Sequence, residues 1–423
     1  DMEMLAAPIT GNELYKTCFK QLKCGKSPGN DGLTVRFYRK FWKLLYPHML
    51  RSLKDGIAAG TLSSTQRQSI VRLIKKKDKD PTQIKNWRPI SLINVDTKIL
   101  SRALTTRIRK ILPKVIGEVQ LGFMDHRNIA EGNRLIEYII EDTDKKGNKA
   151  VVATFDLAKA FDTVDHGYLA SVLSNYGIPE EFISKVKAIY NGAESAVMNN
   201  GRMTNYYNLE RSCRQGDPMS PFLFILAFEP LIKRIRDDQT IKGIRTPRRE
   251  VKLTAYADDL TALLIDMNHL NNVEKTLNEF GEISGLKLNQ DKTEVLAIGQ
   301  TNLTAEQEEK LKDVIKVTGI CHGLPTKKTE TKDANFTGPI NKLQRTLNLW
   351  KSRNLSLLGR AQIFKAQGLA AFMHIANVIP IPSDVTSRIN KIMYNFIWRG
   401  PDKMSREFMA KPIEEGGLNI AKP

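Results

Sequence analysis

The sequence is poor in the features that mark membrane-spanning and disulfide-linked proteins. Its longest uninterrupted apolar stretch, residues 222–228, is far shorter than a membrane span. The first residues are acidic, whereas a secretory signal would be basic. There are four cysteines and no Cys-x-x-Cys pair, so the sequence predicts neither a disulfide framework nor a structural zinc site. These absences favour an intracellular protein with no membrane partner.

Acidic residues are scarce relative to basic ones. The chain has 65 lysines and arginines against 46 aspartates and glutamates, a formal net charge of +19 and a pI near 9.6. Between residues 70 and 115, thirteen basic residues stand against three acidic ones. A charge run is usually a solvated face, but this excess also suits a polyanionic partner such as nucleic acid or a triphosphate.

Length and composition indicate a globular protein of several parts. At 423 residues the chain is too long for one compact core, so we expect two or three subdomains. It contains 41% hydrophobic and 26% charged residues, as ordinary globular proteins do. It starts without an initiator methionine, and we therefore expect a fragment of a longer protein.

Three aspartates stand at predicted strand ends. Asp156 ends an apolar run over residues 151–155, and Asp258-Asp259 lies between apolar runs 251–256 and 260–265, which predict a hairpin. A solvated acidic turn is the ordinary interpretation of an isolated Asp-Asp pair. If the strands are neighbours, however, the carboxylates converge on one sheet edge and suit two Mg²⁺ ions in nucleotidyl transfer, with Mn²⁺ as an alternative ion.

The order of elements predicts an α+β fold. Residues 151–155, 166–176, 251–265, 270–284 and 286–298 alternate strand, helix, hairpin, helix and a strand pair, which describes a helix-backed antiparallel sheet. Residues 96–112 predict a helix ended by Pro113, with its apolar side in the core and its arginines outside. Residues 87–92 predict an extended connector. Beyond residue 300 the pattern is mostly helical, including one long stretch over 356–378.

Several motifs follow one another in the order found in reverse transcriptases. They are Phe155-Asp-Leu-Ala-Lys-Ala-Phe-Asp-Thr-Val-Asp165, Arg214-Gln-Gly-Asp-Pro-Met-Ser-Pro221, Tyr256-Ala-Asp-Asp259 and Leu286-Lys-Leu-Asn-Gln-Asp-Lys292. Upstream, Gly25-Lys-Ser-Pro-Gly-Asn-Asp-Gly32 and Asn86-Trp-Arg-Pro-Ile-Ser-Leu92 resemble finger motifs, and Leu355-Ser-Leu-Leu-Gly-Arg360 resembles a thumb segment. The chain resembles the reverse transcriptase of a non-LTR retrotransposon, the long interspersed element type. One Tyr-x-Asp-Asp string is weak, but several such motifs in order are strong.

The resemblance implies a catalytic role for four residues and a metal site. Asp156, Asp258 and Asp259 would bind the metal ions, and the Leu157 carbonyl would complete one coordination shell. Lys292 would protonate the leaving pyrophosphate; judged without the resemblance it is a surface lysine.

The resemblance also implies a site for the incoming nucleotide. Arg72, Lys75 and Arg88 would meet the triphosphate, although the sequence does not distinguish Lys75 from the two lysines after it. Phe161 would exclude a ribose 2′-hydroxyl; its ordinary interpretation is a core aromatic. Gln215 and Gly216 would line the site.

The implied architecture is a right-hand polymerase. We expect an N-terminal extension with a finger motif over residues 1–69, basic fingers over 70–150, a catalytic palm over 151–300 and a helical thumb over 301–423. One departure from the family pattern lies in the expected primer-gripping hairpin, where Val317-Thr318-Gly319-Ile320 has a threonine at an apolar position.

The function implied is RNA-directed DNA polymerisation, as in target-primed retrotransposition. The partners would be an RNA template, a DNA primer or target and deoxynucleoside triphosphates, and the resemblance implies the nucleus as the location. Two alternatives remain: a reverse-transcriptase-like RNA-binding protein that does not polymerise, and a DNA-templated polymerase with the same metal chemistry. The sequence does not determine the oligomeric state.

Overall fold

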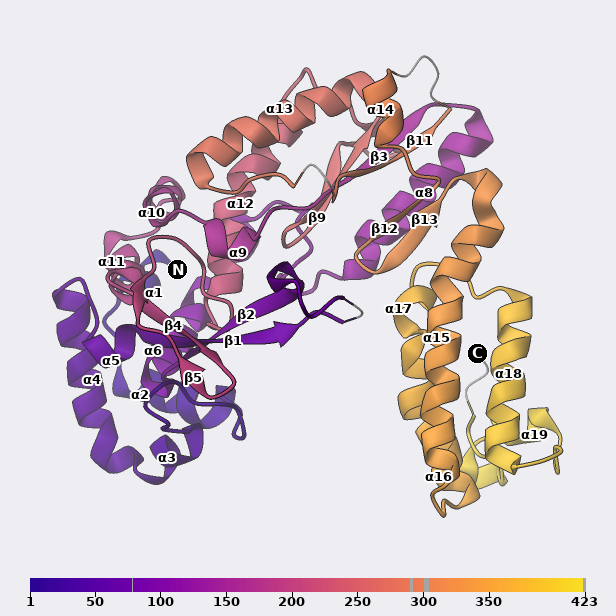
Figure 1. Ribbon diagram of the computed structural model, residues 1–423, viewed down its shortest axis with the longest axis horizontal. Helices are drawn as coiled ribbons and strands as arrows, with labels where there is room; N and C mark the ends of the chain where they lie inside the picture. The colour runs from indigo at the N-terminus through magenta and orange to yellow at the C-terminus, as the bar shows by residue number, and fades with distance from the viewer. Residues whose placement is uncertain (78, 290–291, 300–303, 421–423) are drawn as a thin grey trace.

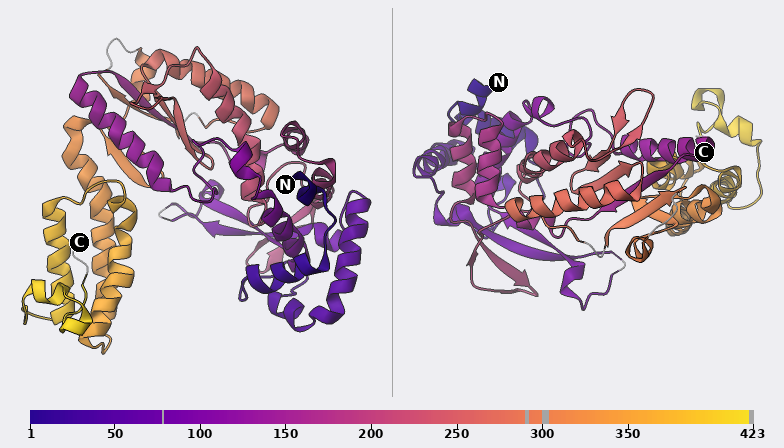
Figure 2. Two further views of the ribbon diagram at one scale, coloured as in Figure 1. Left: turned by 180° about the vertical axis from the view of Figure 1, so that it is seen from behind. Right: turned by 90° about the horizontal axis from the view of Figure 1, so that it is seen from above.

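The protein has three parts arranged around an open side, as a computed structural model shows (Figure 1). It describes residues 1–77, 79–289, 292–299 and 304–420. The N-terminal helices lie at one end, the C-terminal helices at the other, and a sheet with its helices joins them (Figures 1 and 2). Within the described ranges no helix is long and apolar enough to cross a membrane.

The joining part is built on a four-stranded antiparallel sheet in the order β11-β3-β10-β9. Side chains alternate across each strand, and both faces are apolar. On one face Val151 and Ala153 pack with helices α12 and α13, and on the other Ala150 and Val152 pack with helix α8. The bounds are β3 Ala150–Phe155, β9 Leu253–Tyr256, β10 Asp259–Leu264, β11 Glu294–Ile298, α8 Ile129–Lys146, α12 Ser220–Asp237 and α13 Met267–Ser284. The predicted helix-backed antiparallel sheet is confirmed.

The strand pair predicted over residues 286–298 is wrong. Among the residues of this range that the structure describes, only β11 is a strand, and it pairs with β3. Leu288 forms an isolated bridge with Leu157, because the chain returns past the end of β3 before entering β11. Residues 290 and 291 of the expected turn lie outside the described residues.

A second sheet contains the strands expected for the fingers, in the order β2-β1-β4-β5, with β6 also paired to β4. The connector predicted over residues 87–92 is instead the edge strand β2, antiparallel to β1. Pro89 fits there because an edge strand tolerates a missing N–H. The bounds are β1 Gln68–Lys75, β2 Trp87–Ile93, β4 Glu194–Asn199, β5 Arg202–Met203 and β6 Tyr207–Asn208.

The N-terminal helices pack against helix α6, Val95–Ile108, and share one core with the sheet part. The helix ends earlier than predicted, and Pro113 lies in a short helix of its own, α7 Leu112–Val115. The prediction that its arginines stay outside is wrong for Arg107, which is 5% exposed. Arg107 pairs with Glu13 at 2.7 Å and donates to the carbonyls of Ala7 and Pro8, which satisfies the buried charge.

Two further groups of helices and one small hairpin lie in this half of the molecule. At the N-terminus they are α1 Met2–Ala6, α2 Gly11–Lys16, α3 Val35–Lys40, α4 Trp42–Ala58 and α5 Ser64–Arg67. Following β3 they are α9 Ala160–Thr163, α10 His166–Asn175 and α11 Glu180–Tyr190. The small hairpin of β7 Ile244–Arg245 and β8 Glu250–Val251 follows α12.

The C-terminal part begins with a hairpin and continues as helices with their own core. Strands β12 Val314–Val317 and β13 Ile320–Gly323 pack on the α8 face of the sheet, and Ile315 and Val317 join its core. A separate core then lies among α15 Lys328–Lys351, α16 Leu357–Ile363, α17 Met373–Ala376, α18 Ser383–Trp398 and α19 Arg406–Ala410. The single helix expected over 356–378 is interrupted by a π-helical turn, Phe364–Gly368, and a short 3₁₀ turn, Leu369–Ala371.

Candidate active site

The three aspartates lie on one edge of the joining sheet. Strands β3 and β10 are neighbours, and the register pairs Leu260 with Phe155, so Asp156 and Asp259 are the next two residues side by side. Asp258 occupies the two-residue turn between β9 and β10, whose first residue, Ala257, has a φ of 55°. The adjacency on which the sequence prediction depended is therefore present.

The electrostatics of this edge show that the carboxylates interact. Loss of hydration raises the pKa of Asp259 to about 6, with further upward contributions from Asp258 and Asp156. Loss of hydration, and then the charge of Asp156, raises the pKa of Asp258. Like charges at short range oppose ionisation unless a cation neutralises them. The edge therefore favours a bound cation.

Asp156 has two donors of its own. Lys292 Nζ lies 2.7 Å from Asp156 Oδ2, and Asn289 Nδ2 lies 3.2 Å from the same oxygen. The Asn289 backbone N–H also donates to the Asp156 carbonyl at 2.8 Å. Lys292 thus lies at the edge, and so does Asn289, for which the sequence predicted no role although it belongs to the motif over residues 286–292.

The donor set fits magnesium in part. Carboxylate oxygens are the ligands that Mg²⁺ takes, usually one or two from the protein with the remainder from water and substrate phosphates. Across the described ranges no three histidine, cysteine, aspartate or glutamate side chains, the three aspartates of the edge included, form a group that could hold a metal ion by themselves. The aspartates form an open edge, which suits an ion shared with a phosphate substrate.

The loop containing Gln215 and Gly216 is held between strand β2 and helix α9. The Ser91 N–H of β2 donates to the Gln215 carbonyl at 2.7 Å. Gly216 has a φ of 114°, and a Cβ there would lie 2.5 Å from the Ser91 carbonyl oxygen, so only glycine fits. Gln215 Nε2 reaches Asp162 Oδ1 at 3.4 Å, one residue beyond Phe161.

Phe161 is half-buried and packs against the core, as the ordinary interpretation of the residue predicts. It stacks on the buried Phe224 of α12 with ring centroids 4.5 Å apart. Its carbonyl accepts the Cys213 N–H at 2.7 Å. The ring is therefore fixed by the core and lies five residues after Asp156, beside the Gln215 loop.

The basic residues of the fingers divide between two faces of the β1–β2 pair. Arg72 is opposite Ile90 and Ile74 is opposite Arg88, so Arg72 and Arg88 lie on one face. This is the face next to Gly216, since a Cβ at Gly216 would contact the Ile90 side chain. Lys75, paired with Trp87, lies on the other face.

Lys76 continues the face that carries Arg72 and Arg88. Its N–H donates to the Asn86 carbonyl at 2.8 Å, which extends the ladder by one residue beyond Lys75. The sequence left three consecutive lysines undistinguished. The strand register, which only the pairing with residues 87–93 supplies, separates them.

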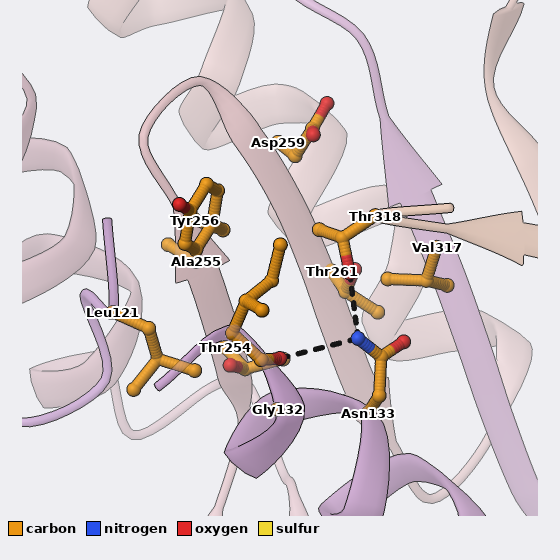
Figure 3. A pocket seen from close by; sticks show the side chains of 11 residues that line it. Leu121, Gly132, Asn133, Thr254, Ala255, Tyr256, Asp259, Thr261, Val317 and Thr318 are labelled. Atoms are coloured by element: carbon orange, nitrogen blue, oxygen red, sulfur yellow. Dashed lines mark hydrogen bonds between the residues drawn. The ribbon is translucent and has the colours of Figure 1, made fainter. Parts of the chain in front are cut away.

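The hairpin with the unusual threonine lies beside the aspartate edge (Figure 3). Val317 and Thr318 line one hollow together with Tyr256 and Asp259. Thr318 has a φ of 45°; its hydroxyl accepts from Asn133 Nδ2 at 2.6 Å and its carbonyl lies 3.0 Å from His374 Nε2. The hydroxyl is thus used as a polar contact to helix α8.

Comparison with known proteins decides the family. The reverse transcriptase (RNA-dependent DNA polymerase) family matches residues 74–348, well over half of the chain. The chain belongs to this family. The right-hand polymerase fold expected from the motifs is therefore confirmed.

Relatives of this chain include retrotransposon proteins. An uncharacterized 149 kDa protein of transposon TX1 from Xenopus laevis is 29% identical over 99% of the chain and 32% of its own length. The Pol polyprotein of element R2DM from Drosophila melanogaster is 28% identical over 69% of the chain and 26% of its own length. The RNA-directed DNA polymerase of mobile element jockey from Drosophila funebris is 24% identical over 62% of the chain and 28% of its own length. These names confirm the resemblance to the long interspersed element type.

The chain spans about a quarter to a third of the length of these relatives. Among solved structures, Candida tropicalis telomerase in complex with a fragment of telomeric RNA has a TM-score of 0.49 at 13% identity, covering 89% of this chain and 60% of that one. That likeness adds nothing to the family assignment.

Proposed function

We propose that this chain is an RNA-directed DNA polymerase that extends a DNA 3′-hydroxyl on an RNA template. The observation that carries the proposal is the edge where Asp156 and Asp259 lie side by side with Asp258 in the adjoining turn. The family match supports it and does not favour an RNA-binding protein without polymerase activity.

The residues at the edge divide the work of nucleotidyl transfer. Asp156, Asp258 and Asp259 hold the divalent ions, joined by the Leu157 carbonyl. When bound, those ions activate the attacking hydroxyl and neutralise phosphate charge. Lys292, already 2.7 Å from Asp156, is close enough to the edge to give a proton to the leaving pyrophosphate.

The residues around the edge bind and select the nucleotide. Arg72 and Arg88 bind the triphosphate from one face of the fingers, with charge-assisted hydrogen bonds. The Gln215 and Gly216 loop lines the nucleotide site. Phe161, held by its stack on Phe224, selects against a 2′-hydroxyl.

Primer extension beside Asp258→Ala tests the proposal. With a DNA primer annealed to an RNA template and Mg²⁺, the parent chain extends the primer, and the variant loses extension while it keeps salt-sensitive binding of the template. If the variant loses template binding as well, the chain has misfolded and the test is repeated with Asp258→Asn. If both chains bind RNA and neither extends, the RNA-binding alternative replaces the proposal.

The template class is tested by the same assay. Extension on an RNA template must exceed extension on a DNA template of the same sequence. Equal or greater use of DNA favours the DNA-templated polymerase.

The lysine run offers a sharper test of the nucleotide site. Lys75→Ala and Lys76→Ala remove equal charge from opposite faces of β1. We expect Lys76→Ala to raise the KM for the nucleotide by about tenfold, the loss of one charged hydrogen bond, and Lys75→Ala to leave it nearly unchanged. The reverse order would place the triphosphate on the other face.

A further inference from the structure

Gln120 is a buried glutamine whose side chain contacts the turn that carries Asp258. Its side chain is fully buried, in the segment between α7 and α8. Gln120 Oε1 accepts the Ala257 N–H at 2.8 Å, and Gln120 Nε2 donates to the Ala257 carbonyl at 3.1 Å. Both polar groups of one backbone residue are thus held by one side chain.

Ala257 needs such support because its backbone is strained. Its φ of 55° is in the left-handed region, which costs a residue with a Cβ about 1 to 2 kcal/mol. No glycine occupies the turn, since the sequence there is Tyr256-Ala-Asp-Asp259. A paired amide that holds both Ala257 groups offsets this cost and sets the direction in which Asp258 leaves the turn.

The segment around Gln120 is itself fixed to the sheet by its backbone. The Leu121 N–H donates to the Ala255 carbonyl at 2.7 Å, and the Ala255 N–H donates to the Val119 carbonyl at 2.9 Å. Arg127 Nη1 donates to the Gln120 carbonyl at 2.7 Å. These bonds do not use the Gln120 side chain, so they remain when the amide is replaced.

We propose that Gln120 is a positioning residue that sets the place of the Asp258 carboxylate. The inference deepens the polymerase function proposed above and rests on it for its consequence in catalysis. Gln120 does not touch substrate; it acts through the Ala257 backbone. Its loss lets the turn relax from the strained conformation and moves the carboxylate away from the edge.

Three variants separate positioning from general stability. Gln120→Met keeps the volume and removes both hydrogen bonds to Ala257, together with the one that Gln120 Oε1 accepts from the Gly122 N–H at 2.8 Å. Gln66→Met is the matched control, because Gln66 is also a buried glutamine, with bonds to Asp96 Oδ2 and the Ser63 N–H, in the N-terminal part. Gln120→Met combined with Ala257→Gly tests rescue, since glycine adopts a positive φ without a Cβ penalty.

The first readout is the single-turnover rate of nucleotide incorporation at saturating primer and template. We expect Gln120→Met to lower this rate at least tenfold and to raise the Mg²⁺ concentration needed for half the maximal rate, with primer–template affinity unchanged within about twofold. The double variant incorporates nucleotide at a rate close to that of Ala257→Gly alone, so most of the loss caused by Gln120→Met is recovered. The rate of Gln66→Met stays near that of the parent.

The second readout does not depend on activity. Amide hydrogen exchange over residues 255–260 becomes faster in Gln120→Met and remains slow in Gln66→Met. If exchange rises but the parent chain does not polymerise, the proposed function fails and the contact with the turn stands. Unchanged exchange, or a rate loss equal in the two methionine variants, would overturn the positioning role.

Discussion

The β9–β10 hairpin and the β12–β13 hairpin both turn through a residue that carries a Cβ at positive φ. Ala257 has a φ of 55° and Thr318 a φ of 45°. In each case a buried amide from the segment before or within α8 contacts that residue, Gln120 in the first hairpin and Asn133 in the second. Both turns lie next to the same hollow, which Tyr256 and Thr318 line.

The two hairpins differ in what the amide holds. Gln120 binds the backbone of Ala257, so its hold does not depend on the side chain at that position. Asn133 binds the hydroxyl of Thr318, so its hold depends on a side chain that the family pattern replaces with an apolar one. The comparison teaches that the buried amide fixes the turn with the carboxylates through its backbone, whereas the amide at the neighbouring turn acts through one substitutable side chain. There the backbone contact is made by His374, whose Nε2 lies 3.0 Å from the Thr318 carbonyl.

The largest expected effect comes from Gly122→Ala. A Cβ at Gly122 would lie 2.3 Å from the Ala257 nitrogen, so the backbone of the Asp258 turn must shift. Because a displacement near 1 Å at reacting groups costs on the order of a hundredfold, we expect that loss in incorporation rate. Gly319→Ala in the other turn is the counterpart: it meets only His374 at 3.4 Å, so it lowers stability through its φ of 96° more than it lowers rate. Equal rate losses would remove the distinction between the turns.

The second hairpin is expected to respond most to Asn133→Ala. Asn133 Oδ1 lies 2.8 Å from Nε2 of His322, whose side chain is fully buried and whose Nδ1 lies 2.6 Å from Glu137 Oε1. Truncation leaves His322 Nε2 without its partner, so we expect a loss of about 2 to 3 kcal/mol in the free energy of unfolding, measured in urea.

A helix-cap variant provides the control for Asn133→Ala. Asn128 caps the same helix through the Ala130 N–H at 2.9 Å and does not contact the hairpin. Asn128→Ala should cost about 1 kcal/mol and leave the rate per folded molecule unchanged. If Asn133→Ala costs no more than this cap, the network around His322 does not stabilise the hairpin.

The pH dependence of stability separates the turns by charge. The pKa of Asp259 is raised from 3.8 to about 6 and that of Asp258 is also raised, so the metal-free native state binds more protons than the unfolded chain between about pH 4 and 6. The contribution of these two protonated carboxyl groups to the free energy of unfolding is therefore present at low pH and is lost as the pH rises through about 6. Asp259→Asn should flatten this fall in thermal melts, whereas Gly319→Ala should run parallel to the parent. Parallel curves for Asp259→Asn and the parent would contradict the raised pKa.

The sequence predicted the aspartate edge because its elements are local. The apolar run before Asp156 and the two runs around Asp258 are strong strand patterns, and the single assumption needed was that β3 and β10 are neighbours, which the register confirms. The helices were also found, although Pro113 begins a short helix instead of ending a long one. The roles of the individual site residues stay predictions.

What the sequence could not supply depends on contacts between distant segments. Gln120 is 137 residues from Ala257, and no local pattern marks a glutamine as the partner of a turn. Arg107 looks like a surface arginine until the carbonyls of the first helix enclose it. The choice between Lys75 and Lys76 needs the strand register. In each case the missing information is which distant segments lie next to each other in the folded chain.

The smallest expected effect is that of Thr318→Asn. Asparagine adopts positive φ more readily than a β-branched residue, and its amide oxygen can accept from Asn133 Nδ2 in place of the hydroxyl. The backbone strain at residue 318 is relieved while the hydrogen bond from Asn133 is kept. We therefore expect the free energy of unfolding to rise by up to about 1 kcal/mol, with the incorporation rate within about twofold of the parent. Thr318→Val is the control, because it keeps the β-branched strain and loses the hydrogen bond, and it should lower stability. If Thr318→Asn is as harmful as Thr318→Val, then the threonine hydroxyl itself, not the backbone strain, governs this turn, and the two hairpins differ more than their φ values indicate.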